Sequence, residues 1–138
     1  MKAMILEKVG SMPENKRPLT WVEMAPPAPH GDDLLVKVSA CSVCHTELDE
    51  IEGRTPPSTL PMIPGHQVVG QVQGLGPDAH RYKPGDRVGV AWIFSACGVC
   101  RLCRDGYENL CQDFKATGRD AHGGYAEYMT VSERFTYR

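Results

Sequence analysis

Four short segments of the chain concentrate or alternate apolar and β-branched side chains, which is the pattern of half-buried β-strands. They are residues 34–40, 67–74, 87–92 and 125–131. Turn-forming sequences separate them, such as HGDD at residues 30–33 and KPGD at residues 83–86. Short strands divided by Gly and Pro in this way predict a mainly β domain.

One segment predicts a helix. Residues 44–52 place Leu48 and Ile51 three positions apart, with carboxylates between them, and the pattern stops at Gly53, a suitable C-cap. Within the first 33 residues, the apolar runs around Met4 and Trp21 predict a hairpin that precedes the proline-rich sequence APPAP.

Length and composition narrow the class of protein. A chain of 138 residues with 41% hydrophobic content suits one globular domain, so we expect residues 1–138 to form a single unit. The formal net charge of −2 argues against a nucleic-acid partner. No run reaches the ~18 apolar residues of a membrane span, and no secretory signal is visible, so we expect a cytoplasmic protein.

The strongest chemical signal is a set of four cysteines in the pattern C-x-x-C-x-x-C-x7-C: Cys97, Cys100, Cys103 and Cys111. Four thiolates this close match a closed structural zinc site, which stabilises a loop and performs no chemistry. Two local disulfides or four reduced thiols are the alternatives, and a reducing cytoplasm disfavours the first. Arg101 and Arg104 could offset the negative charge of such a site.

A second group of possible ligands is weaker when taken alone. Cys44 lies in CSVCHTE and His66 lies in PGHQVVG, 22 positions later. Cys41, Cys44 and His45 also match C-x-x-C-H, the attachment motif of c-type haem. The haem interpretation leaves the downstream motifs unexplained and normally requires export, so we disfavour it.

The ordered set of motifs resembles the zinc-dependent alcohol dehydrogenases of the medium-chain dehydrogenase/reductase superfamily. The motifs are Cys-His-Thr before a short acidic helix, Pro-Gly-His before a valine-rich strand, Lys-Pro-Gly-Asp-Arg-Val, the four-cysteine pattern and Gly-Gly-Tyr-Ala-Glu-Tyr. The resemblance covers nearly the whole chain. It implies their N-terminal catalytic domain, a GroES-like β-barrel with short helices and an irregular zinc-binding lobe.

The resemblance also implies roles for single residues. Cys44 and His66 would be two ligands of a catalytic zinc, and the four cysteines of the lobe would hold a structural zinc. Thr46 would be the hydroxyl that carries the proton away from the alcohol. His45 would contact the phosphates of the cofactor and extend this proton relay to solvent.

Two residues behind the ligands depart from the pattern of the family. Glu47 stands where the family usually has aspartate, and Gln67 stands where it usually has glutamate. A carboxylate behind a metal-bound imidazole orients the ring and raises its basicity. Glu47 keeps that charge on a longer arm, whereas Gln67 loses it.

Several of these residues have simpler interpretations. Thr46 could cap the helix that follows it. His30, His80 and His122 lie in turn-like segments, and we expect all three at the surface. We expect Cys41 to be a buried and inert thiol.

The resemblance implies parts that this sequence does not contain. No G-x-G-x-x-G follows a predicted strand. NAD or NADP would therefore bind to a separate Rossmann domain, which would also supply the third ligand of the catalytic zinc. We expect a catalytic domain that does not turn over a small alcohol or aldehyde by itself and that could self-associate through its uncovered apolar face. The alternative is a zinc-stabilised binding or scaffold module without catalytic activity.

Overall fold

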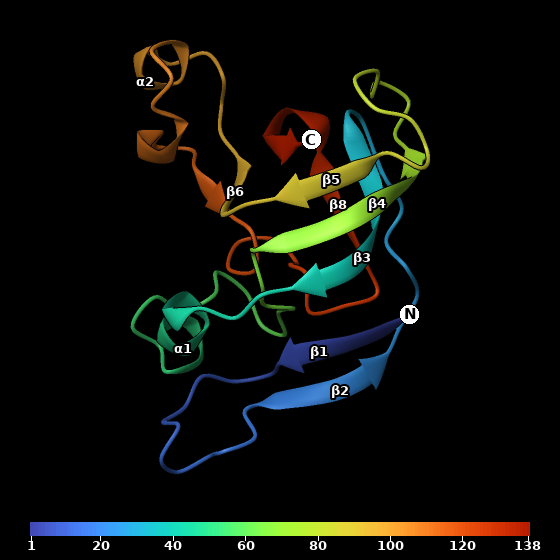
Figure 1. Cartoon of the computed structure of the whole chain (residues 1–138). Coiled ribbons are helices and arrows are strands. Elements are labelled where there is room, and N and C mark those ends of the chain that lie inside the picture. Colours follow the sequence, from blue (N-terminus) through green and yellow to red (C-terminus); the bar gives the residue numbers. More distant parts are fainter.

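The computed structural model describes residues 1–138. Its centre is a five-stranded antiparallel sheet with the strand order β8-β3-β4-β5-β9, which curls into a half-barrel (Figure 1). The strands are β3 (Asp33–Cys41), β4 (Val68–Leu75), β5 (Arg87–Val90), β8 (Tyr128–Ser132) and β9 (Thr136–Tyr137). The expectation of a mainly β domain is confirmed.

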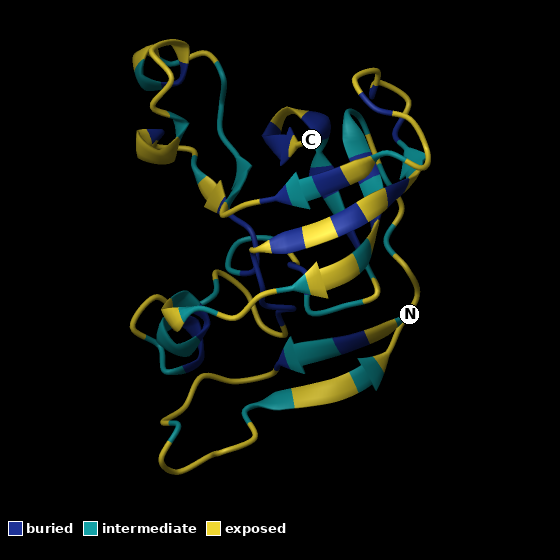
Figure 2. Ribbon diagram, in the orientation of Figure 1, coloured by how far each residue is buried: buried dark blue, intermediate teal, exposed yellow.

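Alternating side chains build the core of this half-barrel. Along β4, Val68, Gly70 and Val72 are buried, and the residues between them are exposed (Figure 2). Successive side chains of a strand point to opposite faces, so one face of β4 packs inward. The cluster inside the sheet consists of Leu34, Val36, Val68, Val72, Ala79, Tyr82, Val88, Val90, Met129 and Val131.

The predicted hairpin near the N-terminus is present. Strands β1 (Lys2–Leu6) and β2 (Leu19–Glu23) pair antiparallel in a separate two-stranded sheet. Isolated bridges from Ala3 to Ala126 and from Leu6 to Met62 fasten β1 to the body of the domain.

Two predicted strands are shorter than their sequence pattern. Strand β5 ends at Val90, because the chain turns at Ala91 and Trp92 into the cysteine-containing lobe. Strand β8 begins only at Tyr128, since the residues before it pair with β1, as in the bridge from Ala3 to Ala126 and the 3.0 Å bond from Glu127 N to Lys2 O.

Helix α1 (His45–Ile51) confirms the predicted helix. Of its two apolar residues, Ile51 is buried and Leu48 is half-buried. Two acidic residues, Glu47 and Glu50, are buried as well, and Glu47 lies against His66 in the loop before β4.

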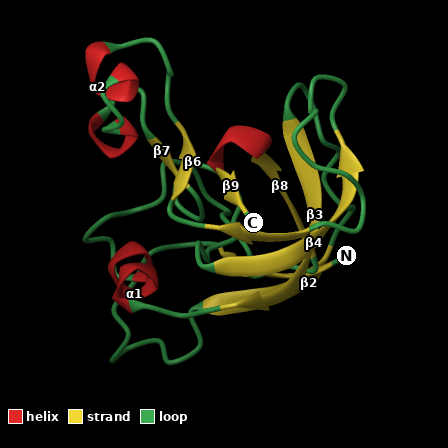
Figure 3. Cartoon of the chain, turned by 45° about the horizontal axis from the view of Figure 1, so that its top comes forward, coloured by secondary structure: helices red, strands yellow, loops and turns green.

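A separate lobe follows β5. It contains β6 (Ile93–Ser95), α2 (Arg101–Arg104), the 3-10 turn η1 (Glu108–Leu110) and β7 (Lys115–Ala116), and β6 pairs with β7. A further 3-10 turn, η2 (Glu133–Phe135), joins β8 to β9. The lobe and α1 lie at the same end of the sheet (Figure 3). Neither helix has the length and apolar character needed to cross a bilayer.

Candidate metal centres

The pairing of β3 with β4 brings Cys44 and His66 together. Cys41, the last residue of β3, is the register partner of Val68, the first residue of β4. Cys44 lies three residues beyond the end of β3, and His66 lies two residues before the start of β4. Antiparallel pairing therefore places the two side chains at one end of the half-barrel despite their separation in sequence.

The separation of the two ligand atoms fits a zinc ion. Cys44 Sγ lies 3.5 Å from His66 Nε2. Tetrahedral zinc with Zn–S near 2.3 Å and Zn–N near 2.0 Å separates two such ligands by ~3.5 Å. One thiolate and one imidazole are also donors that zinc prefers. The pair therefore fits half of a tetrahedral zinc site.

Glu47 contacts both Cys44 and His66. Its Oε1 lies 3.0 Å from His66 Nδ1, and its Oε2 accepts a 2.7 Å hydrogen bond from the backbone N–H of Cys44. The second contact belongs to a capping box in which Cys44 is the N-cap of α1. Because Nδ1 faces Glu47, the other nitrogen of His66 is directed toward the sulfur.

Glycines allow the backbone behind His66 to pack closely. Gly65 has φ of +95°, and its carbonyl accepts a 2.8 Å hydrogen bond from Gly124 N. A Cβ on Gly123 would collide with the carbonyl oxygen of Gly65 and would lie 2.7 Å from that of Pro64. The Gly-Gly sequence at residues 123–124 thus supports the loop that positions His66.

The four cysteines of the lobe form a second centre. Their sulfur atoms all lie within 4.8 Å of one another, with 3.9 Å between Cys97 and Cys103 and 4.0 Å between Cys100 and Cys111. Tetrahedral zinc requires sulfur atoms ~3.8 Å apart, so the group fits a zinc ion. All six cysteines of the chain are free thiols, which contradicts local disulfides in the lobe.

The surroundings act differently on the thiols of this lobe. Backbone N–H groups of Val99 and Cys100 lower the pKa of Cys97 to about 6. Burial raises the pKa of Cys103 to about 12. Cys97 is therefore the thiolate that is available first, and Cys103 ionises when a cation offsets the cost of burial.

The other residues predicted for the site of Cys44 and His66 differ in their exposure and in their contacts. Thr46 is half-buried, and its backbone N–H donates to Cys44 Sγ at 3.4 Å. The side chain of His45 is 78% exposed and extends outward, with Nε2 3.7 Å from an oxygen of Asp49. Gln67 is exposed, and its backbone carbonyl accepts a 2.9 Å bond from Ser42 N.

Two simpler interpretations need correction. Thr46 is not the cap of α1, because Cys44 occupies the N-cap position and its sulfur accepts the helical N–H. Cys41 is half-buried instead of fully buried, although burial still raises the pKa of its thiol to about 11. The three histidines expected at the surface, His30, His80 and His122, are exposed.

Glu50 is a buried residue that the sequence pattern did not reveal. It is 0% exposed, and neither carboxylate oxygen has a hydrogen-bond partner. Burial, followed by the negative charge of Glu47, raises the pKa of Glu50 to about 7. No local pattern distinguishes it from Glu52, which is half-buried and pairs with Arg54.

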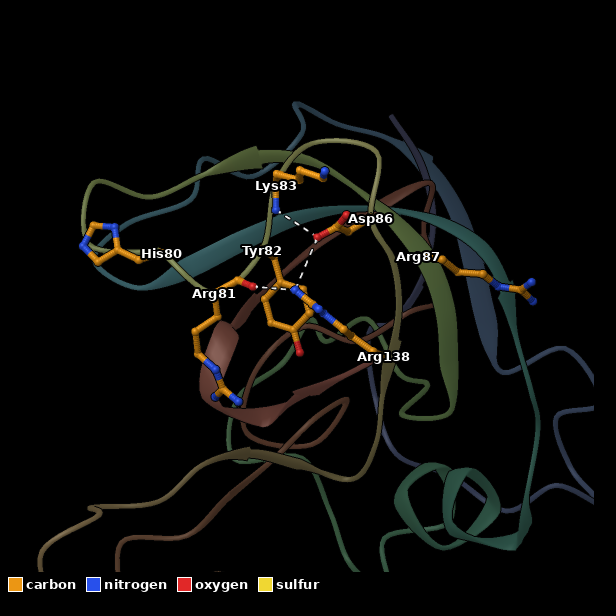
Figure 4. A pocket seen from close by; sticks show the side chains of 7 residues that line it. All are labelled: His80, Arg81, Tyr82, Lys83, Asp86, Arg87 and Arg138. Atoms are coloured by element: carbon orange, nitrogen blue, oxygen red, sulfur yellow. Dashed lines mark hydrogen bonds and ion pairs between the residues drawn. The ribbon is translucent and has the colours of Figure 1, made fainter.

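A hollow of about 570 Å³ in the surface is lined by residues of neither group of ligands (Figure 4). Its cationic side chains do not converge, because Arg81 and Arg87 point away from each other. Arg138 stacks on the ring of Tyr82 and lies 3.9 Å from Asp86. This hollow contributes no residue to either candidate metal centre.

Comparison with known proteins identifies the family. Residues 30–138 match the family model described as the alcohol dehydrogenase GroES-like domain, so the chain belongs to that family. The alcohol dehydrogenase of Geobacillus stearothermophilus is 42% identical over an alignment 139 positions long, which covers 100% of this chain and 40% of that enzyme. The chain thus spans less than half the length of this relative. The expected GroES-like fold is confirmed.

Solved structures agree with this assignment. A thermostable alcohol dehydrogenase from Pyrobaculum aerophilum with bound cobalt and zinc superposes with a TM-score of 0.90 at 29% identity, over 99% of this chain and 40% of that one. An NAD-dependent alcohol dehydrogenase superposes with a TM-score of 0.87 at 29% identity, over 99% of this chain and 38% of that one.

Proposed function

We propose that residues 1–138 form the catalytic domain of a zinc-dependent alcohol dehydrogenase, which oxidises alcohols to aldehydes or ketones. In this proposal Cys44 and His66 hold the catalytic zinc, and the lobe cysteines hold a structural zinc. The observation that carries the proposal is the 3.5 Å approach of Cys44 Sγ to His66 Nε2 in a domain of this family.

Each residue around this pair has a part in the reaction. When bound, a zinc ion would act as a Lewis acid that makes the hydroxyl proton of an alcohol easier to remove. Glu47 holds His66 in the orientation that directs Nε2 toward Cys44. Thr46, two residues after Cys44 in the chain, accepts the proton and passes it on, and the exposed side chain of His45 carries it to solvent.

The proposal requires a second domain. Cys44 and His66 provide two ligands, whereas Glu47 is already engaged with both of them. The third ligand and the NAD or NADP cofactor belong to a Rossmann domain, with His45 contacting the phosphates of the cofactor. Val43, 70% exposed beside Cys44, and Trp92, 40% exposed, give that domain or a second copy an apolar surface to cover.

Zinc counting separates this proposal from a scaffold module in which only the lobe holds metal. When the chain is joined to a cofactor domain that supplies the third ligand, we expect about two zinc ions per chain after purification without added zinc, and about one in Cys44→Ser and in Cys103→Ser. A single zinc in the parent, unchanged in Cys44→Ser, would support the scaffold module. A cytoplasmic location goes with the proposal, because metal-binding thiolates require a reducing compartment.

Activity is the second test. The chain joined to a cofactor domain of the family should reduce NAD or NADP when an alcohol is supplied. Thr46→Ser should keep most of the rate, and Thr46→Ala should lose about 100-fold or more, because only the first keeps the hydroxyl. Equal rates in the two variants would exclude Thr46 from the proton relay.

A further inference from the structure

Arg134 reaches from the half-barrel to the cysteine lobe. It lies in η2, the short turn drawn in red beside β8 and β9 in Figure 3. Its guanidinium group lies directly against Gly98: a Cβ on that glycine would overlap Nη2 and would lie 3.3 Å from Cζ. Gly98, with φ of +73°, is in the turn between Cys97 and Cys100. A permanent positive charge therefore covers the turn that carries two of the four sulfur atoms.

The backbone that carries this guanidinium is fixed to the barrel. The backbone N–H of Arg134 donates to Ser132 Oγ at 3.2 Å. The neighbouring carboxylate, Glu133, is buried and accepts bonds of 2.8 and 2.7 Å from the backbone N–H groups of His80 and Arg81. Arg134 is thus presented to the lobe from a well-anchored turn, although its side chain is exposed.

The arginines inside the lobe are placed differently. The side chain of Arg101 is 94% exposed and lies 3.5 Å from Asp105, which offsets its charge. Arg104 is exposed as well. The expected role of Arg101 and Arg104 in offsetting the charge of the site stays a prediction, and Arg134 is a cation that the sequence pattern did not indicate.

The thiols of the metal-free lobe hold protons that zinc binding displaces, so binding takes the site from a charge near zero to −2, the sum of four thiolates and one Zn²⁺. A nearby cation therefore stabilises the metal-bound state more than the metal-free state. We propose that Arg134 is the counter-charge of the four-cysteine centre and that it slows the loss of zinc from the lobe. This inference rests on the proposed structural zinc. It gives Arg134, a residue of the half-barrel, a role at the metal centre of the lobe.

The test measures zinc release from the chain into a chromophoric chelator. Cys44→Ser and His66→Ala are included throughout, so that only the lobe contributes. At low ionic strength, Arg134→Ala should release zinc about fivefold faster than the parent, and Arg134→Lys should lie close to the parent. Arg101→Ala, which removes a cation from the lobe itself, is the matched control and should leave the rate unchanged.

Zinc release at high salt distinguishes the loss of the Arg134 charge from the loss of its packing. At 1 M salt the Debye length falls to about 3 Å, so the rates of Arg134→Ala and its parent should converge. Equal rates at low salt, or a difference that persists at 1 M salt, would overturn the role of Arg134. A parent that binds no zinc in the lobe would instead overturn the proposed structural zinc, and Arg134 would lose its role with it.

Discussion

The carboxylate of Glu47 lies 3.0 Å from Nδ1 of His66, and both side chains are almost fully buried. The same carboxylate accepts the backbone N–H of Cys44. One acidic side chain thus links helix α1 to the loop before β4. The geometry of the candidate catalytic centre depends on this link as much as on the two ligands themselves.

Replacing Glu47 tests that link. Glu47→Gln keeps the size of the side chain but removes its charge, so the affinity of the Cys44 and His66 site for zinc should fall about 10-fold or more. Chelator competition measures this loss. Asp49→Asn, on the same helix but paired with the exposed Arg54, is the control and should bind zinc like the parent. An unchanged affinity in Glu47→Gln would show that its contact with His66 does not orient the ring.

The buried carboxyl of Glu50 should make stability depend on pH. Its pKa rises from an ordinary 4.5 in the unfolded chain to about 7 in the folded one. Between these values the folded state holds a proton that the unfolded state has lost, so stability is greatest at low pH within this window. It should fall by about 3 kcal/mol as the pH rises through it and change little above pH 7.

Urea unfolding from pH 5 to pH 8 measures this slope, and Glu50→Gln should flatten it. Glu52→Gln, which removes the carboxylate that pairs with Arg54 in the same segment, is the matched control and should retain the slope. If Glu50→Gln keeps the full pH dependence of the parent, another group is responsible for it.

The close packing at Gly123 should make this position intolerant of a side chain. A Cβ there would overlap the carbonyl oxygen of Gly65, which is backbone and cannot move aside locally. Gly123→Ala should lower the free energy of unfolding by about 3 kcal/mol. Gly10→Ala, where no atom lies within 4 Å of the added Cβ, should change it by less than about 0.5 kcal/mol. Thermal unfolding compares the two variants, and similar Tm values would contradict the packing argument.

Removing metal should destabilise the lobe. The four sulfur atoms are brought together by a loop with little regular structure, so a bound zinc contributes directly to its folding. A chelator should lower the Tm of the parent by about 5 °C or more. The Tm of Cys103→Ser should be lower from the start and should respond less to the chelator. A parent whose Tm is insensitive to chelator would show that the thiols pack without metal.

The helix illustrates how far local patterns reach. The segment from Cys44 to Gly53 predicted α1 correctly, because helix formation and its C-terminal glycine are local properties. The spacing of Leu48 and Ile51 did not reveal that Glu47 and Glu50 are buried. Which side of a seven-residue helix faces inward depends on what the rest of the chain places beside it, and Glu47 lies against His66 in the loop before β4.

The sequence by itself determined the four longer strands of the half-barrel, the N-terminal hairpin, helix α1 and the two groups of candidate thiol and imidazole ligands, since alternation, turn residues and cysteine spacing are encoded within a few neighbouring positions. Only the tertiary structure decided that Glu47 lies against His66, that Glu50 is buried without a partner and that Arg134 covers Gly98. These relationships join segments or faces that no local pattern connects. They arise because the antiparallel pairing of β3, β4 and β8 brings distant loops to common ends of the sheet.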